Sequence, residues 1–266
     1  MRLSLDNWIN SINTGRCEEL IPQLPDESID ILITSPPYNV DLGDNKYNKT
    51  PYDLYKDNKD HKDFIMWLYE IFGLIKPKMV TGGRICINIG DGKNGQVPTH
   101  SDIIQFMTHE LEYVLKATLI WNKSQVGNRT AWGSFASPSN PSFPTPFEYI
   151  LIFCKEDQFK KGERENITIT KEEFIRNSLA LWQFAPESRM KKFGHPAMFP
   201  LELPFRLIQS LSYKGDVVLD IFSGVGTTCL AAAMLERLWI GFELSEKYAK
   251  RSRKRLNKYL DQTRLF

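Results

Sequence analysis

Short apolar segments alternate with amphipathic ones along most of the chain. Residues 29–33, 149–153 and 217–221 are apolar runs with the length of buried strands. Residues 64–75 and 201–211 carry apolar side chains at helical spacing. Because predicted strands and helices follow one another in turn, the pattern indicates an α/β fold with a doubly wound, mostly parallel sheet.

The rest of the pattern fits the same fold and adds two long insertions. Further strands are predicted at residues 11–17, 84–91, 114–121 and 239–243, and further helices at residues 18–24, 102–111, 229–236 and 246–259. Residues 39–61 and 122–147 are polar and follow neither period, so we expect loop insertions there. We expect residues 1–266 to form a single domain.

Composition narrows the class of protein only a little. With 266 residues, of which 42% are hydrophobic and 25% charged, the chain is ordinary for one large soluble domain. A net charge of +2 leaves nucleic-acid binding open, because a local basic groove would be enough. The four cysteines have no paired spacing, and no apolar run is long enough to span a membrane. We expect a cytoplasmic protein without a metal site or a disulfide.

The strongest local signal is the sequence Ser35-Pro36-Pro37-Tyr38, just after the strand predicted at residues 29–33. Ligands of open α/β sheets bind beyond the carboxyl ends of the strands. The prolines have fixed φ angles and no N–H group, so their carbonyl groups are rigid, free acceptors. Tyr38 offers a flat face for stacking. The four residues together suit a planar ring with an exocyclic amine, as a flipped-out nucleobase presents.

A second signal lies near the carboxyl-terminal end, where a predicted strand leads into a glycine turn and then a helix. Gly224 and Gly226 permit a sharp turn that brings the backbone close to a ligand. The helix that follows opens on Thr227 and Thr228 and offers unpaired N–H groups. A dinucleotide site would use a third glycine; Cys229 stands there instead, which weakens that alternative without removing it.

The two motifs together resemble those of DNA amino-methyltransferases, which transfer a methyl group from S-adenosylmethionine to N4 of cytosine or N6 of adenine. Residues 34–38 resemble the catalytic motif of that family, and residues 217–228 resemble its cofactor loop. The catalytic motif comes first, which is similar to the permuted beta class. The resemblance covers nearly the whole chain. It implies a circularly permuted, Rossmann-like methyltransferase sheet, S-adenosylmethionine as cofactor, and flipping of a base from double-stranded DNA. It also implies a restriction-modification system, and it leaves monomer and homodimer both open.

The same resemblance implies roles for particular residues. Glu243 would accept hydrogen bonds from ribose hydroxyls, and residues 195–200 would close over the methionine part of the cofactor. The catalytic set is Ser35, Pro36, Pro37 and Tyr38. The cofactor-binding set is Asp220, Phe222, Ser223, Gly224, Gly226, Thr227, Thr228, Glu243, Phe199 and Pro200. One position departs from the family. Arg16 stands where relatives often have an acidic residue that accepts a hydrogen bond from the adenine amine of the cofactor, and a guanidinium cannot accept a hydrogen bond.

The first residue of the catalytic motif bears on the target base. Adenine enzymes of this family usually carry Asp-Pro-Pro-Tyr, whereas cytosine enzymes usually carry Ser-Pro-Pro-Tyr. A neutral Ser35 hydroxyl can donate to N3 of cytosine, which a carboxylate would repel. The sequence therefore favours N4 of cytosine, with N6 of adenine as the alternative.

Polar and basic loop residues are candidates for DNA contacts, although each alone is more often a solvated surface residue. The candidates are Lys123, Arg129, Trp132, Ser134 and Lys191. Residues 156–194 occupy the place where this subfamily usually holds a target-recognition region. Lys155, Lys160, Lys161 and Arg164, in or beside that region, are further candidates for phosphate contacts. Methylation of RNA or protein, and a DNA-binding relative without turnover, are the alternative functions.

Overall fold

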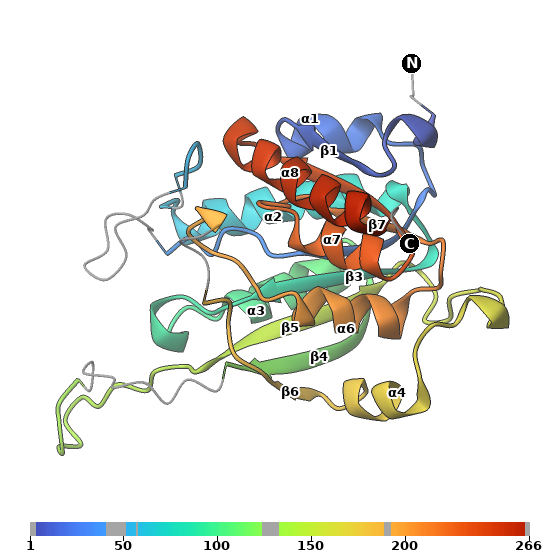
Figure 1. Cartoon of the computed structure of the whole chain (residues 1–266). Coiled ribbons are helices and arrows are strands. Elements are labelled where there is room, and N and C mark those ends of the chain that lie inside the picture. The colour runs from blue at the N-terminus through green and yellow to red at the C-terminus, as the bar shows by residue number, and fades with distance from the viewer. Residues whose placement is uncertain (1–3, 41–51, 57, 124–132, 189–192, 264–266) are drawn as a thin grey trace.

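An eight-stranded sheet runs through the centre of the molecule in the order β1-β8-β7-β2-β3-β5-β4-β6 (Figure 1). The computed structural model describes residues 4–40, 52–56, 58–123, 133–188 and 193–263. The strands, in sheet order, are β1 Ser11–Thr14, β8 Leu238–Glu243, β7 Val217–Asp220, β2 Ile29–Thr34, β3 Met79–Ile89, β5 Phe147–Cys154, β4 Val114–Asn122 and β6 Leu181–Gln183. This confirms the predicted α/β class.

Strand directions confirm a mostly parallel sheet. All neighbouring pairs are parallel except the two that involve β5, which is antiparallel to both β3 and β4. The other seven strands therefore end at the same edge of the sheet, and β5 begins at that edge. The first strand, β1, pairs with the last strand, β8, as a permuted chain order requires.

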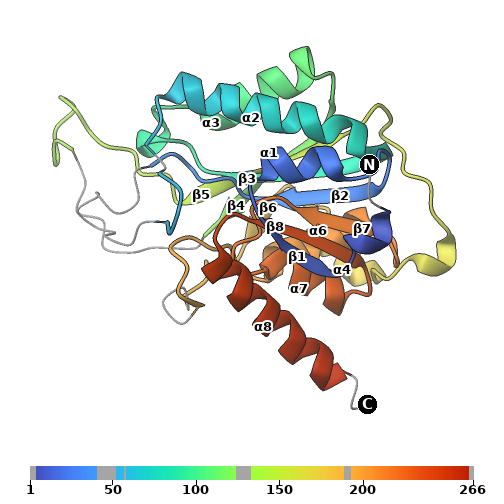
Figure 2. The same cartoon turned by 90° about the horizontal axis from the view of Figure 1, so that it is seen from above.

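Helices cover both faces of the sheet (Figure 2). One face carries α1 (Cys17–Leu20), α2 (His61–Ile75) and α3 (Thr99–Gln105), and the other carries α6 (Glu202–Leu211), α7 (Thr227–Met234) and α8 (Glu246–Thr263). The short helix α4 (Lys171–Asn177) lies beside α6 near the β6 edge. Among the described residues, no helix combines the length and apolar character needed to cross a bilayer.

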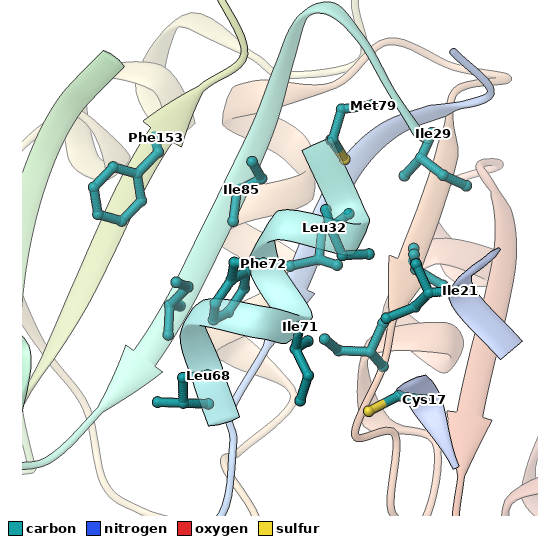
Figure 3. Packing of buried hydrophobic residues seen from close by; sticks show 14 of the residues in the cluster. Cys17, Ile21, Ile29, Leu32, Leu68, Ile71, Phe72, Met79, Ile85 and Phe153 are labelled. Atoms are coloured by element: carbon teal, nitrogen blue, oxygen red, sulfur yellow. The ribbon is translucent and has the colours of Figure 1, made fainter. Parts of the chain in front are cut away.

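The molecule has two hydrophobic cores, one between each face of the sheet and the helices that cover it. Both faces supply core residues because strand side chains alternate between them. Leu32 of β2 faces α2 and packs with Leu68 and Phe72 (Figure 3). Ile31 and Ile33 of the same strand belong to the core beneath α6 and α7. A strand that is apolar on both sides reads as an unbroken hydrophobic run, which is why residues 29–33 are recognisable in the sequence.

The differences between predicted and observed elements lie mainly at their ends. The helix predicted at residues 102–111 is α3 followed by one π-helical turn, Phe106–Glu110. The predicted helix at residues 18–24 is α1 followed by a 3-10 turn, Ile21–Gln23. Strand β6 is not among the predicted strands, because three residues are too few to show a period. Helix α4 is also missing from the predicted elements; a capping box between Thr170 and Glu173 begins it.

Candidate active site

A cavity of about 790 Å³ opens at the edge where the parallel strands end, and both sequence motifs line it. Ser35 and Tyr38, after β2, form one part of the wall, and Asp220 and Ser223, after β7, form another. β2 and β7 are direct neighbours in the sheet. The Thr34 hydroxyl donates a 2.8 Å hydrogen bond to the Asp220 carboxylate and joins the two strand ends. Two motifs far apart in sequence are thus held side by side.

The glycine turn after β7 needs both of its glycines. Gly224 and Gly226 have φ angles of +53° and +75°, in the left-handed region that other residues rarely adopt. Gly226 is also the residue from which α7 begins, and its N–H donates to the Ser223 carbonyl at 2.7 Å. A side chain at Gly226 would overlap the Ser252 hydroxyl of α8. The turn therefore combines a special backbone conformation with close packing.

Two buried carboxylates lie at the ends of β7 and β8. Burial raises the pKa of Asp220 to about 6. The hydrogen bonds that the carboxylate accepts from Thr34 and the Phe222 amide lower the pKa, but by less than burial raises it. Burial also raises the pKa of Glu243 to about 7. The Glu243 oxygens accept 2.8 Å hydrogen bonds from the Gly224 and Ser245 amides. A carboxylate has about four acceptor sites, so Glu243 can accept further hydrogen bonds from the cavity.

Aromatic side chains, one of them from α2, form another wall of the cavity. Trp67 lies with its ring centre 5.6 Å from that of Phe222, and 5.6 Å from that of Tyr55, on which it stacks. Such a wall suits a flat heterocycle.

The same wall contains an acid that the sequence analysis missed. The Glu18 carboxylate accepts a 2.8 Å hydrogen bond from the Trp67 indole and a 3.0 Å bond from Arg16. Burial would raise the pKa of Glu18, but hydrogen bonds, above all from Trp67, lower it below its usual value. Glu18 and Arg16 both line the cavity, so an acid is present two residues after the position where the family often has one. Glu18 falls within the helix predicted at residues 18–24, where an acidic residue is ordinary, so the sequence gives no sign that it lines a cavity.

The segment that follows residue 194 closes another side of the cavity. The His195 ring lies over Gly224 and packs edge-on against Tyr248, with 4.6 Å between ring centres. Burial lowers the pKa of His195 to about 4, so the ring is neutral at physiological pH. Phe199 lines the cavity, whereas Pro200 does not. The Pro200 carbonyl accepts a hydrogen bond from the Leu203 amide at the start of α6.

The predicted cofactor residues thus divide into two groups. Asp220, Phe222, Ser223, Thr227, Glu243 and Phe199 line the cavity. Gly224, Gly226, Thr228 and Pro200 are not part of its lining, and Thr228 is fully buried. The second group can shape the site but does not present side chains to it.

The Tyr38 hydroxyl is fixed by a network of buried and half-buried polar groups. It accepts hydrogen bonds from Asn88 at 2.6 Å and from Ser35 at 3.1 Å, and it donates to Glu148 at 2.7 Å. Asn88 also donates to Glu148 at 2.7 Å, and Lys123 forms an ion pair with the other Glu148 oxygen. Burial raises the pKa of the Tyr38 phenol well above its usual value, and the Glu148 carboxylate raises it further.

Asn88 and Glu148 are functional candidates that the sequence analysis missed. Asn88 lies within β3 and Glu148 within β5, and both line the cavity beside Tyr38. One signal was present in the sequence: an acidic residue immediately before the apolar run at residues 149–153 has no structural reason to be there.

The predicted DNA-contact residues have mixed locations. Lys123 lines the cavity and pairs with Glu148, so its ammonium group is engaged with this carboxylate in the structure. Ser134 lies in a loop that projects from the sheet (Figure 1), where its hydroxyl accepts from the Asn140 amide. Arg129, Trp132 and Lys191 lie outside the described residues.

Two of the lysines considered for phosphate contacts are placed differently from the prediction. The Lys160 ammonium group forms ion pairs with Asp30 at 2.8 Å and Asp216 at 3.0 Å, at the edge where β2 and β7 begin. The buried Lys155 donates to the Met79 carbonyl, at the start of β3. Both ammonium groups thus lie where parallel strands begin, at the edge opposite the cavity, and are engaged by these partners.

Only the end of the segment at residues 156–194 reaches the cavity within the described part of the chain. Ala185, Pro186, Glu187 and Ser188, which follow β6, line it. In the described ranges, no group of three or more potential metal-binding His, Cys, Asp or Glu residues is present. All four cysteines are buried and free.

Sequence comparisons relate the chain to known proteins. A family of DNA methylases, of the N6 and N4 type, matches residues 29–254. The type II methyltransferase M.MjaVI of Methanocaldococcus jannaschii is 39% identical over 69% of this chain and 90% of its own length. A second protein of that organism, the type II methyltransferase M.MjaI, is 31% identical and covers 84% of both chains.

Solved structures show the same architecture. A protein of Thermus thermophilus, named as a DNA modification methylase and solved with S-adenosyl-L-methionine, is 29% identical and covers 93% of both chains, with a TM-score of 0.73. The cytosine-N4-specific PvuII DNA methyltransferase is 22% identical over 92% of this chain and 85% of its own, with a TM-score of 0.69. At that identity, the second match speaks to the fold alone.

Proposed function

Because this chain belongs to the N6/N4 family of DNA methylases and is an S-adenosylmethionine-dependent DNA amino-methyltransferase, we propose that its target is N4 of cytosine in duplex DNA. We further propose that Ser35, Pro36, Pro37 and Tyr38 hold the flipped-out base. The observation that carries this proposal is the shared cavity: the Ser-Pro-Pro-Tyr corner and the glycine turn line one space at the ends of two neighbouring strands.

The residues around the glycine turn fit S-adenosylmethionine, which supplies an electrophilic methyl group when it is bound. Glu243 has acceptor sites left for ribose hydroxyls. The buried Ser223 hydroxyl has no hydrogen-bond partner among the described residues, which leaves it available to a polar ligand. Trp67 and Phe222 offer flat surfaces for an adenine ring, and Glu18 offers an acceptor for its amine.

On the other side of the cavity, the catalytic corner can position and polarise an amine. The Pro36 carbonyl accepts one amine hydrogen and the Ser35 hydroxyl accepts the other, which draws the nitrogen away from conjugation with the ring. Tyr38 stacks on the base, a contact worth about 1–3 kcal/mol. This offsets part of the few kcal/mol that extraction of the base from the duplex costs.

The choice of cytosine rests on the neutral side chain at position 35. The resemblance to the family associates serine at this position with cytosine enzymes and aspartate with adenine enzymes, and the Ser35 hydroxyl, whose proton is donated to Tyr38, carries no charge. We expect nucleosides from methylated DNA to contain N4-methylcytosine. The measurement is mass detection after digestion of unmethylated duplex DNA treated with the enzyme and cofactor. N6-methyladenine as the sole product would reassign the target base.

Glu243 should make cofactor affinity depend on pH. Its pKa is raised to about 7, and the ionised form accepts hydrogen bonds better, so affinity should fall by about tenfold as the pH drops from about 8 to 6. Equilibrium binding of S-adenosylmethionine by calorimetry measures this. The free energy of unfolding of the free protein should instead decrease as the pH rises from 4.5 to about 7. In that range Glu243 ionises readily in the unfolded chain, whereas its raised pKa makes ionisation costly in the folded protein.

The matched control for this prediction is Glu243→Gln, which should bind more weakly but lose the change in affinity near pH 7. The buried Asp220, whose pKa is about 6, will leave a smaller dependence at lower pH in both proteins. An unchanged pH dependence in Glu243→Gln would remove Glu243 from the cofactor site.

For DNA, we propose one domain whose recognition surface combines the loop that contains Ser134 with residues 185–188. Residues 185–188 line the cavity, and the loop that contains Ser134 joins β4 to β5 at the same edge of the sheet. The type II methyltransferases among the relatives support a role in restriction-modification. Methyl transfer from labelled cofactor to duplex DNA, and not to RNA or protein, tests the substrate class.

A further inference from the structure

A chain of three oxygen groups, two half-buried and one buried, leads away from the place proposed for the target amine. The Ser35 hydroxyl donates to the Tyr38 hydroxyl at 3.1 Å, and the Tyr38 hydroxyl donates to the Glu148 carboxylate at 2.7 Å. The three residues come from β5 and the loop after β2, and all of them line the cavity. The chain therefore connects the reacting end of the cavity to a carboxylate.

The direction of these hydrogen bonds is fixed by Asn88. A phenol oxygen has two acceptor sites and one proton. The Asn88 amide and the Ser35 hydroxyl fill the acceptor sites of Tyr38, so the Tyr38 proton is directed toward Glu148. The raised pKa of Tyr38 keeps that proton on the oxygen.

Glu148 is the only carboxylate in contact with this chain among the described residues, and it is kept close to the surface. Its side chain is 11% exposed, and that of its ion-pair partner Lys123 is 26% exposed. The Lys123 charge compensates the carboxylate, which would otherwise be costly to bury. A proton that arrives at Glu148 therefore has a short route to water.

The reaction needs such an acceptor, because a methylated exocyclic amine carries one proton too many. We propose that Glu148 is the terminal proton acceptor of the methyl transfer, reached through Ser35 and Tyr38. This inference rests on the proposed amino-methylation and assigns a role to a residue outside the sequence motif.

The proton steps balance without any further reactant. The amine N–H bond breaks and its proton passes to the Ser35 oxygen, while the original Ser35 proton passes to Tyr38 and the Tyr38 proton passes to Glu148. Ser35 and Tyr38 each gain and lose one proton and end neutral. Glu148 ends as a carboxylic acid and returns its proton to water. The amine nitrogen keeps the electron pair of the broken N–H bond.

Two substitutions interrupt the chain at different points. Glu148→Gln removes the acceptor, and Tyr38→Phe removes the hydroxyl while it keeps the ring. Each should lower the single-turnover rate by about a hundredfold, the usual contribution of a positioned base. The double variant should be no slower than the slower single variant, because both block the same route. The measurement uses labelled S-adenosylmethionine at saturation and unmethylated duplex DNA of mixed sequence.

The pH profile separates proton acceptance from a merely structural role. Glu148 accepts a proton only as a carboxylate, so the wild-type rate should fall as the pH is lowered, and this fall should be lost in Glu148→Gln. The polar groups that face Glu148 are Lys123, Tyr38 and Asn88. Asn88→Ala is the matched control: it removes two hydrogen bonds from the same cluster, including the one that orients Tyr38, but keeps all three oxygen groups of the chain, so it should be slower yet keep the acidic fall.

The outcomes distinguish this inference from the proposed function. Full-speed transfer by both Glu148→Gln and Tyr38→Phe, or an acidic fall that persists in Glu148→Gln, would overturn the relay and leave the methyltransferase function standing. Wild-type protein that methylates no DNA would overturn both. Equal cofactor binding and equal unfolding temperatures in all variants exclude a folding defect as the cause of a lower rate.

Discussion

Replacement of Tyr38 by alanine should slow methyl transfer by at least about a hundredfold and change S-adenosylmethionine affinity by no more than about twofold. The ring supplies the proposed stacking surface, and the hydroxyl supplies the link between Ser35 and Glu148. Both are lost together. The cofactor wall, around Trp67 and Phe222, does not depend on Tyr38 for any of its ring contacts.

The measurement pairs single-turnover rates with equilibrium binding of the cofactor. Tyr55→Ala is the matched control, since Tyr55 stacks on Trp67 at the other side of the cavity. It should show the reverse pattern, with weaker cofactor binding and a smaller loss of rate at saturating cofactor. Equal losses of rate and cofactor affinity in Tyr38→Ala would contradict the role assigned to this tyrosine.

Replacement of Gly226 by alanine should destabilise the protein and weaken cofactor binding together. A left-handed backbone costs a non-glycine residue about 1–2 kcal/mol. The overlap of the new side chain with Ser252 adds to this cost. For a domain of this size we expect the unfolding temperature to fall by about 4 °C or more. Because the turn carries the backbone that meets Glu243, cofactor affinity should fall at least about tenfold, or about 1.4 kcal/mol.

Gly215→Ala separates the two causes. Gly215 has a φ angle of +85°, but a side chain there would meet open space, so only the backbone cost applies. Its unfolding temperature should fall less than that of Gly226→Ala, and its cofactor affinity should stay normal. Ser252→Ala in the Gly226→Ala background should recover part of the stability. A Gly226→Ala protein as stable as Gly215→Ala would show that packing against α8 is unimportant.

The sheet and the two motifs could be predicted because each leaves a local mark. Residues 29–33 and 217–221 are unbroken apolar runs, and each is followed at once by a distinctive turn. Because parallel strands end at one edge of a sheet, the proximity of those turns can be predicted even where the structure of the residues between them cannot.

The polar network around Tyr38 could not be predicted, because its residues show almost no local sequence pattern. Asn88 lies in β3, Lys123 directly follows β4 and Glu148 lies at the start of β5, and only the strand order places them in contact. Glu18 was missed because a helix pattern and a cavity wall look alike in sequence.

The lysines show a different limit. Charge alone suggests that Lys155 and Lys160 are basic surface residues, yet the side chains of both are buried in the structure. Their position follows from the direction of β5, which ends at the opposite edge from its neighbours. A sequence pattern predicts that a strand exists, but it does not state which way the strand points.

The reversed direction of β5 also governs where new specificity can arise. The chain leaves β5 on the far edge, and it crosses back through α4 and β6 before it meets the cavity at residues 185–188. Residues 156–180 thus form a long detour that touches none of the groups assigned to catalysis. A change in the length of this detour would alter how residues 185–188 approach the cavity and would leave the catalytic groups in place.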